Sequence, residues 1–320
     1  MFSGDFKAIH EQMPLLGELG EALKERVDIP GYVTASGDNV ELWLTYLSQT
    51  QPWISQPVNL RNKALFLELT QEIGFILKNR ESTQGIDCPP WLMSLVSCWH
   101  KSESIVITLN YDTLIERVAR MIKIGDNDSL AHDQIYPVEF QDVRRSAMSW
   151  GSTEVLTFTL AKLHGSVNWY YSGADSYYGE PIYSSPVAAW DCTYKCQEDQ
   201  GLKASSDKVP LIVPPTTEKV LYFQHETMRR MWATAGEALQ SATHLVCIGY
   251  SLPVTDLSLQ FFLRSCRQHG KIPLTIVNKD EGIVSHYRNL LKGFYQINSS
   301  YSGSNAVMNF VNDFCTMPAE

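Results

Sequence analysis

The sequence predicts an α/β fold in which helices cover both faces of a parallel sheet, and two observations lead to this prediction. Runs of consecutive apolar, often β-branched residues at 104–108, 243–248 and 274–277 are typical of strands buried on both sides. Each run is followed by a polar loop and then by a stretch with helical spacing of its apolar residues. This alternation is expected of parallel strands joined by crossover helices.

The residues before the first strand are predicted to be helical. Apolar residues recur at intervals of three and four between 15 and 27, and a second helical stretch covers roughly 40–47. A longer helix at 60–77 is apolar over a wide arc, as expected of a mostly buried helix. We expect an added helical block at 27–100, inserted within a single domain that covers 1–320.

A further strand is predicted at 157–163, and the segment HGSVNW at 164–169 follows it. The polar stretch 126–150 is predicted to be an insertion, as is 170–208, which is rich in Gly, Ser, Tyr and Pro. Long loops of this kind often act as lids or binding loops, so we interpret 170–208 as a lid-like insertion. Ligands of parallel sheets bind beyond the carboxyl ends of the strands, where the polar loops converge.

The composition indicates a folded chain with a sizeable core. The chain has 320 residues, of which 44% are hydrophobic and 19% charged, which excludes global disorder. Its net charge of −9 and the lack of a basic patch favour a small molecule or a protein as partner over nucleic acid. The N-terminus lacks a signal-peptide pattern and no apolar run approaches the length of a membrane span, so we expect a soluble cytoplasmic protein.

Seven cysteines are present, an odd number that favours reduced thiols. Cys192 and Cys196 have a spacing that could supply two zinc ligands. A structural zinc site usually needs four ligands, and no second pair of suitable spacing accompanies them. We therefore expect a plain loop pair and no metal.

Motifs stand in series at the predicted strand ends. They are TLNYDTLIE at 108–116, KLHGSVNW at 162–169 and IGYSLPVTD at 248–256, followed by IVN at 276–278. In order and position they resemble the signatures of the sirtuin-like domains found in bacterial defence proteins, over roughly residues 1–315. The resemblance implies a Rossmann-like domain that binds NAD and cleaves its nicotinamide–ribose bond.

The resemblance also implies roles for individual residues. Asn110 would hold the water or the ribose near the anomeric carbon, Asp112 would be the loop aspartate, and His164 would act as the base. Ser251 and Asn278 would hold phosphate and the adenosine ribose. The chemistry agrees, because an oxocarbenium-like sugar needs an oriented nucleophile and a base, and an unperturbed histidine titrates near pH ~6.5.

Each proposed catalytic residue also has a structural interpretation. His164 could hydrogen bond to backbone at a strand end, and Asn110 could serve a turn through its tolerance of left-handed backbone angles. Asp112 immediately precedes a predicted helix, where it would be a good N-cap. We favour the catalytic interpretation for Asn110 and His164, and leave both interpretations open for Asp112.

The N-terminus departs from the family pattern of a strand followed by a Gly-Ala-Gly-x-Ser turn. Only three residues precede Gly4, and the segment 3–8 resembles the tail of that turn. On this resemblance Gly4 and Phe6, with Thr108 and Gly249, are assigned to NAD binding. Three explanations stay open: a chain start placed too late, a remodelled site that still binds NAD, or a domain that has lost catalysis.

The predicted function is therefore hydrolysis of NAD, as an NAD glycohydrolase acting in antiviral or stress defence. Its expected partners are NAD or ADP-ribose, and either further copies of itself in a homo-oligomer or a separately encoded sensor protein. One alternative is a non-catalytic subunit that senses NAD or ADP-ribose or oligomerises. A less favoured alternative is an NAD-dependent protein deacylase, which would need a zinc module with four cysteines.

Overall fold

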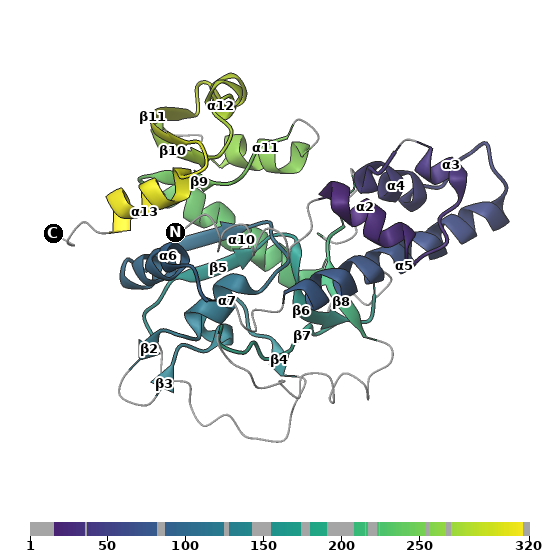
Figure 1. Ribbon diagram of the computed structural model, residues 1–320, viewed down its shortest axis with the longest axis horizontal. Helices are drawn as coiled ribbons and strands as arrows, with labels where there is room; N and C mark the ends of the chain where they lie inside the picture. The colour runs from purple at the N-terminus through teal and green to yellow at the C-terminus, as the bar shows by residue number, and fades with distance from the viewer. Residues whose placement is uncertain are drawn as a thin grey trace. The chain divides into compact units, whose positions relative to one another are not determined.

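The computed structural model describes residues 16–35, 37–81, 87–124, 128–142, 155–173, 180–190, 208–214, 216, 223, 225–253, 256–266 and 270–315 (Figure 1). Its parallel strands are flanked by helices, which confirms the predicted α/β class. No helix within these residues is long and apolar enough to cross a bilayer.

The chain divides into two compact units. Unit 1 consists of Met1–Pro89, Ile107–Leu156 and Lys162–Met231. Unit 2 consists of Pro90–Val106, Thr157–Ala161 and Trp232–Glu320. The organisation as one domain stays a prediction.

The described N-terminal part of unit 1 is helical, as predicted. Its helices are α2 (Leu16–Lys24), α3 (Gly31–Thr34), α4 (Val40–Ser48) and α5 (Gln56–Arg80). Asn39 caps α4 by accepting a hydrogen bond from the Leu42 N–H at 3.2 Å. The apolar faces of α2, α4 and α5 meet in one core cluster, where Leu23, Leu44 and Leu69 are fully buried.

Two of the predicted strands form a pair that leads into the site. They are β1 (Ile105–Thr108) and β5 (Thr159–Lys162). The Thr159 N–H donates to the Ser104 carbonyl and the Leu163 N–H to the Thr108 carbonyl, each at 3.0 Å, so the strands run parallel. After β1 a loop leads to α7 (Leu114–Ala119), and beyond it lie β2 (Lys123–Ile124), β3 (Asp128–Ser129) and the 3₁₀ helix η1 (His132–Ile135).

The chain reverses after β5 and forms a strand where the sequence predicts a polar strand-end segment. This strand is β6 (Gly165–Tyr171), and it is buried along its whole length. It pairs antiparallel with β7 (Tyr183–Ser184) and β8 (Val209–Ile212), while β4 (Gln141–Asp142) pairs parallel with β7. Its polar residues Ser166 and Asn168 interrupt the apolar pattern, so the sequence did not indicate a second strand here.

The predicted lid-like insertion at 170–208 therefore begins inside β6 and contains β7. Its role as a lid stays a prediction. Cys192 and Cys196 lie outside the described residues.

Unit 2 contains a parallel sheet with the strand order β11-β10-β9 (Figure 1). The strands are β9 (Leu245–Ile248), β10 (Ile272–Asn278) and β11 (Tyr295–Ser302). The helices of this unit include α6 (Pro90–Lys101), α11 (Leu257–Ser265), α12 (Ile283–Leu291) and α13 (Ala306–Cys315). A further helix, α10 (Glu226–Ser241), begins in unit 1 and ends in unit 2.

Helices cover both faces of this sheet, as the sequence predicts. Leu274 and Ile276 of β10 pack in one core cluster with side chains of α11 and α12, including Leu263 and Tyr287. Val277, on the opposite face, packs in another cluster with residues of α6 and α13. Successive residues of a strand point to opposite faces, so a continuous apolar run serves both clusters.

The predicted helical block at 27–100 does not match the two units in its bounds. Leu19 and Leu23 of α2 precede it and yet belong to the same core cluster as α4 and α5. Its last helix, α6, belongs to unit 2, where Leu95 packs with Phe310 of α13. Apolar helix faces pack against the surfaces that fit them, whether or not these are near in the sequence. The sequence pattern does not reveal which surfaces those are.

Gly165, where the chain reverses into β6, cannot be replaced without strain. Its φ is +84°, and a Cβ atom there would lie 2.1 Å from the Leu211 carbonyl oxygen on β8. Gly173 has a φ of +98° with open space around it, which makes it a matched control.

We expect Gly173→Ala to lower the free energy of unfolding by about 1–2 kcal/mol, the usual cost of left-handed backbone. We expect Gly165→Ala to cost clearly more, because β8 must also move away from β6. Urea denaturation of both variants measures the difference. Equal losses for the two would show that the close contact with Leu211 is unimportant.

Candidate functional site

The loop between β1 and α7, residues 109–113, carries the first motif and is fixed through the backbone of Tyr111. The Tyr111 carbonyl accepts hydrogen bonds from the Val167 N–H at 2.9 Å and from the Ser166 hydroxyl at 3.2 Å. The Tyr111 hydroxyl donates to the Val213 carbonyl at 2.6 Å. We call residues 109–113 the NYD loop.

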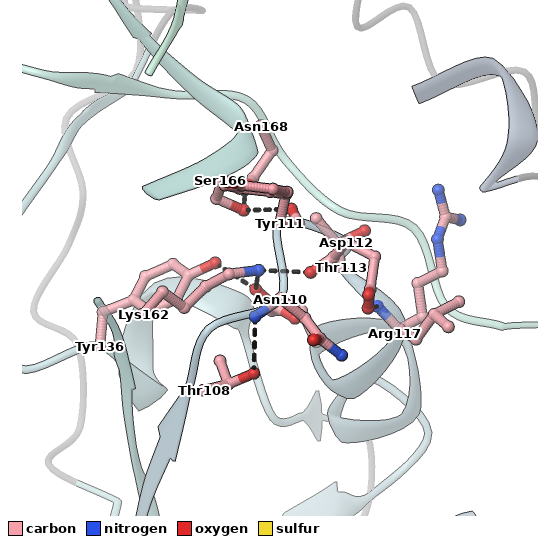
Figure 2. A network of polar contacts seen from close by, with 12 residues as sticks. Thr108, Asn110, Tyr111, Asp112, Thr113, Arg117, Tyr136, Lys162, Ser166 and Asn168 are labelled. Carbon is pink, nitrogen blue, oxygen red and sulfur yellow. Dashed lines mark hydrogen bonds and ion pairs between the residues drawn. The ribbon is translucent and has the colours of Figure 1, made fainter. Parts of the chain in front are cut away.

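A buried lysine holds the next residue of the NYD loop (Figure 2). The Lys162 ammonium, at the end of β5, donates to the Asp112 carbonyl and to Glu116 Oε1, the latter at 2.9 Å. The Lys162 and Glu116 side chains are each only 1% exposed. The Tyr136 hydroxyl donates to the same Glu116 oxygen at 2.7 Å. The end of β5, α7, the residue after η1 and the NYD loop therefore meet at one buried ion pair.

A second buried carboxylate holds the far end of the loop. Glu81, directly after α5, accepts hydrogen bonds from both the N–H and the hydroxyl of Thr113. The Arg117 guanidinium lies 3.8 Å from the same Glu81 oxygen. Burial raises the pKa of Glu81 to about 7, although Arg117 and the bonds from Thr113 act in the opposite direction.

Asp112 lies two residues before α7, whose N-cap is Thr113. Its Oδ1 accepts a hydrogen bond from the Leu114 N–H at 3.2 Å. Burial raises the pKa of its carboxyl, with the charge of Lys162 opposing and that of Glu116 adding to the shift. Asp112 is therefore not the N-cap of α7, although its side chain hydrogen bonds to the backbone of the first helical residue. A catalytic role for Asp112 stays a prediction.

Asn110 is the exposed member of the loop. Its side chain is exposed, whereas Tyr111 and Asp112 are half-buried and Thr113 is buried. The Asn110 N–H donates to the Thr108 hydroxyl at 3.1 Å, so Thr108 shapes the start of the loop. A polar amide thus projects from a loop in which Tyr111, Asp112 and Thr113 are hydrogen bonded to other parts of the protein.

His164 lies at the neighbouring strand end, in the turn between β5 and β6. It is buried, and its carbonyl accepts a hydrogen bond from the Val213 N–H at 2.8 Å. The centroid of its ring lies 6.4 Å from that of Tyr111, with 32° between the ring planes. The structure therefore brings His164 against the residue that follows Asn110.

The third motif lies in unit 2, where β9 and β10 end side by side. Asn278 is buried and donates from its amide to the Tyr250 carbonyl at 3.3 Å, while its Oδ1 accepts from the Asp280 N–H at 3.0 Å. The Tyr287 hydroxyl donates to the same Tyr250 carbonyl at 2.9 Å. Neutral hydrogen bonds thus join the two strand-end loops.

Ser251 is exposed and follows this junction, and Gly249 turns the chain there with a φ of +70°. The predicted convergence of Asn110 and His164 with Ser251 involves both units and stays a prediction. Gly4 and Phe6 lie outside the described residues.

No sequence pattern indicated that charged residues hold the NYD loop. Glu116 and Lys162 stand inside the quoted motifs, so their motif membership was an available signal. Glu81 and Tyr136 lie outside the motifs, and nothing in their sequence context indicates the contacts that they make. Neither a protein-family model nor a curated protein matches the chain.

The raised pKa of Glu81 predicts how stability depends on pH. The folded state releases this proton at about pH 7, and an unperturbed glutamate does so at 4.5. Between these values the folded state binds more protons than the unfolded state, so the free energy of unfolding falls as pH rises through this range. The loss is at most about 1.4 kcal/mol per pH unit.

Glu81→Gln keeps the acceptor oxygen for Thr113 and removes the titration. We therefore expect a smaller loss of stability between pH 5 and pH 8 in this variant than in the wild type, measured by urea denaturation. The raised pKa of Asp112 also lowers the free energy of unfolding as pH rises, and this contribution is present in both the variant and the wild type. The same loss in both would refute the assignment to Glu81.

Proposed function

We propose that this chain hydrolyses NAD⁺ at the bond between nicotinamide and ribose. The observation that carries the proposal is the exposed amide of Asn110 on a loop held by buried side chains, with His164 at the neighbouring strand end. Hydrolysis of a glycosidic bond needs an oriented water and a base, and these two residues can supply both functions.

The chemistry of the bond explains why so few groups are needed. Nicotinamide leaves as a neutral molecule, because the electron pair of the broken bond neutralises the pyridinium nitrogen, so no general acid is required. The ribose carbon acquires oxocarbenium character and is attacked by water. In this proposal Asn110 orients the water and His164 accepts its proton, and the products are nicotinamide, ADP-ribose and one proton.

The resemblance of the motifs supports the wider proposal. It assigns Thr108, Gly249, Ser251 and Asn278 to NAD binding, and it supports a role in antiviral or stress defence in the cytoplasm. Activity would then be controlled by assembly of a homo-oligomer or by a separately encoded sensor protein.

Variants at the two proposed catalytic residues test the proposal. We expect Asn110→Ala and His164→Ala each to lower kcat for nicotinamide release by about 10²–10⁴-fold, because each group acts in the transition state. NAD binding, measured by calorimetry, should change little. His244→Ala is the matched control, because His244 is exposed and contacts Thr275.

The outcomes separate the functions. Full turnover in His164→Ala would assign that histidine to structure and overturn the mechanism. NAD binding without nicotinamide release, with or without an activating partner, would favour the non-catalytic sensing subunit. Removal of acetyl groups from a lysine peptide strictly dependent on NAD would favour the deacylase.

A further inference from the structure

Two charged residues inside the motifs have no part in the proposed reaction. Lys162 closes β5 two residues before His164, and Glu116 lies in the first turn of α7, four residues after Asp112. Their ion pair is fully buried, which is an unusual place for two charges. A function for the pair must therefore explain why it is buried at this point of the fold.

Stability alone is a poor explanation. Removing two charges from water costs free energy that their attraction recovers only with good geometry and further hydrogen bonds, and apolar replacements of similar volume are often as stable. Glu116 gains its further bond from Tyr136. Burial and the charge of Glu116 raise the pKa of Tyr136 well above its usual range, so the phenol remains protonated and donates.

A second contact of the ammonium links the ion pair to the NYD loop. Lys162 Nζ also donates to the carbonyl of Asp112, two residues after Asn110 (Figure 2). A single cation therefore joins the strand end that carries His164 to the loop that carries Asn110. On the far side of that contact, Thr113 is held by Glu81.

We propose that Lys162 and Glu116, assisted by Tyr136, are positioning residues that fix Asn110 relative to His164. The expected effect on catalysis rests on the proposed hydrolysis of NAD⁺. The rigidity of the NYD loop does not depend on that proposal. Lys162 fixes the position of the Asp112 carbonyl through its hydrogen bond, and Glu116 orients the ammonium toward that carbonyl. Misplacement of a reacting group by about 1 Å can cost about 100-fold in rate.

The decisive variant replaces both charges with apolar side chains, Lys162→Met with Glu116→Leu. A single replacement would leave one buried charge without its partner and could prevent folding. Tyr136→Phe is a milder second variant, because it removes only one hydroxyl. Lys208→Met with Glu180→Leu is the matched control, because that pair, 2.8 Å apart, binds Ser172 instead of the NYD loop.

Two readouts are measured on each protein: amide hydrogen exchange at 110–114, and kcat and KM for nicotinamide release. In the Lys162/Glu116 double variant we expect a protein that stays folded at the assay temperature, with faster exchange at 110–114 and kcat lowered by about 100-fold with little change in KM. Tyr136→Phe should show the same changes to a smaller extent. The Lys208/Glu180 control should show neither.

Wild-type exchange and kcat in the double variant would overturn the inference. Unfolding of the double variant, together with wild-type exchange and kcat in Tyr136→Phe, would also overturn it, because the pair would then serve the fold alone. A wild type that releases no nicotinamide would refute the proposed function, while the exchange at 110–114 would still decide whether the pair holds the loop.

Discussion

The ammonium of Lys162 is buried, and this places a strict condition on its surroundings. A charge removed from water needs an opposite charge and hydrogen-bond acceptors close by. Glu116 supplies the charge and the Asp112 carbonyl supplies an acceptor, while Tyr136 completes the bonding of Glu116. Because these groups come from α7, from the NYD loop and from the residue after η1, β5 can bury its lysine only when all of them are in place.

The two strand-end junctions of the protein are built from different chemistry. In unit 1 the NYD loop is held by ionisable groups, including Glu81, whose protonation changes near neutral pH. In unit 2 the loop after β9 is held by the amide of Asn278, at the end of β10, and by the hydroxyl of Tyr287 in α12, which are both neutral groups. Glu81 therefore makes the bonding of the NYD loop sensitive to pH near neutrality.

The position of His164 depends on a strand that follows it by more than forty residues in the sequence. The Val213 N–H, just after β8, binds the His164 carbonyl, and β8 approaches Gly165 closely enough to exclude a side chain. His164 follows β5, which pairs parallel with β1, and the turn at His164 is fixed by β8, the antiparallel partner of β6. The site thus lies where parallel and antiparallel pairing meet.

The sequence by itself determined the α/β class, the strands at 105–108 and 245–248, and the motif residues that follow them, because apolar runs and helical spacing are local patterns. Only the tertiary structure decided that Lys162 binds the Asp112 carbonyl and that Glu81 holds Thr113. These contacts join residues 50 and 32 positions apart, and no local pattern encodes such distances. The strand β6 was not predicted for a related reason. Neighbouring elements bury its polar residues, and the sequence pattern does not show those neighbours.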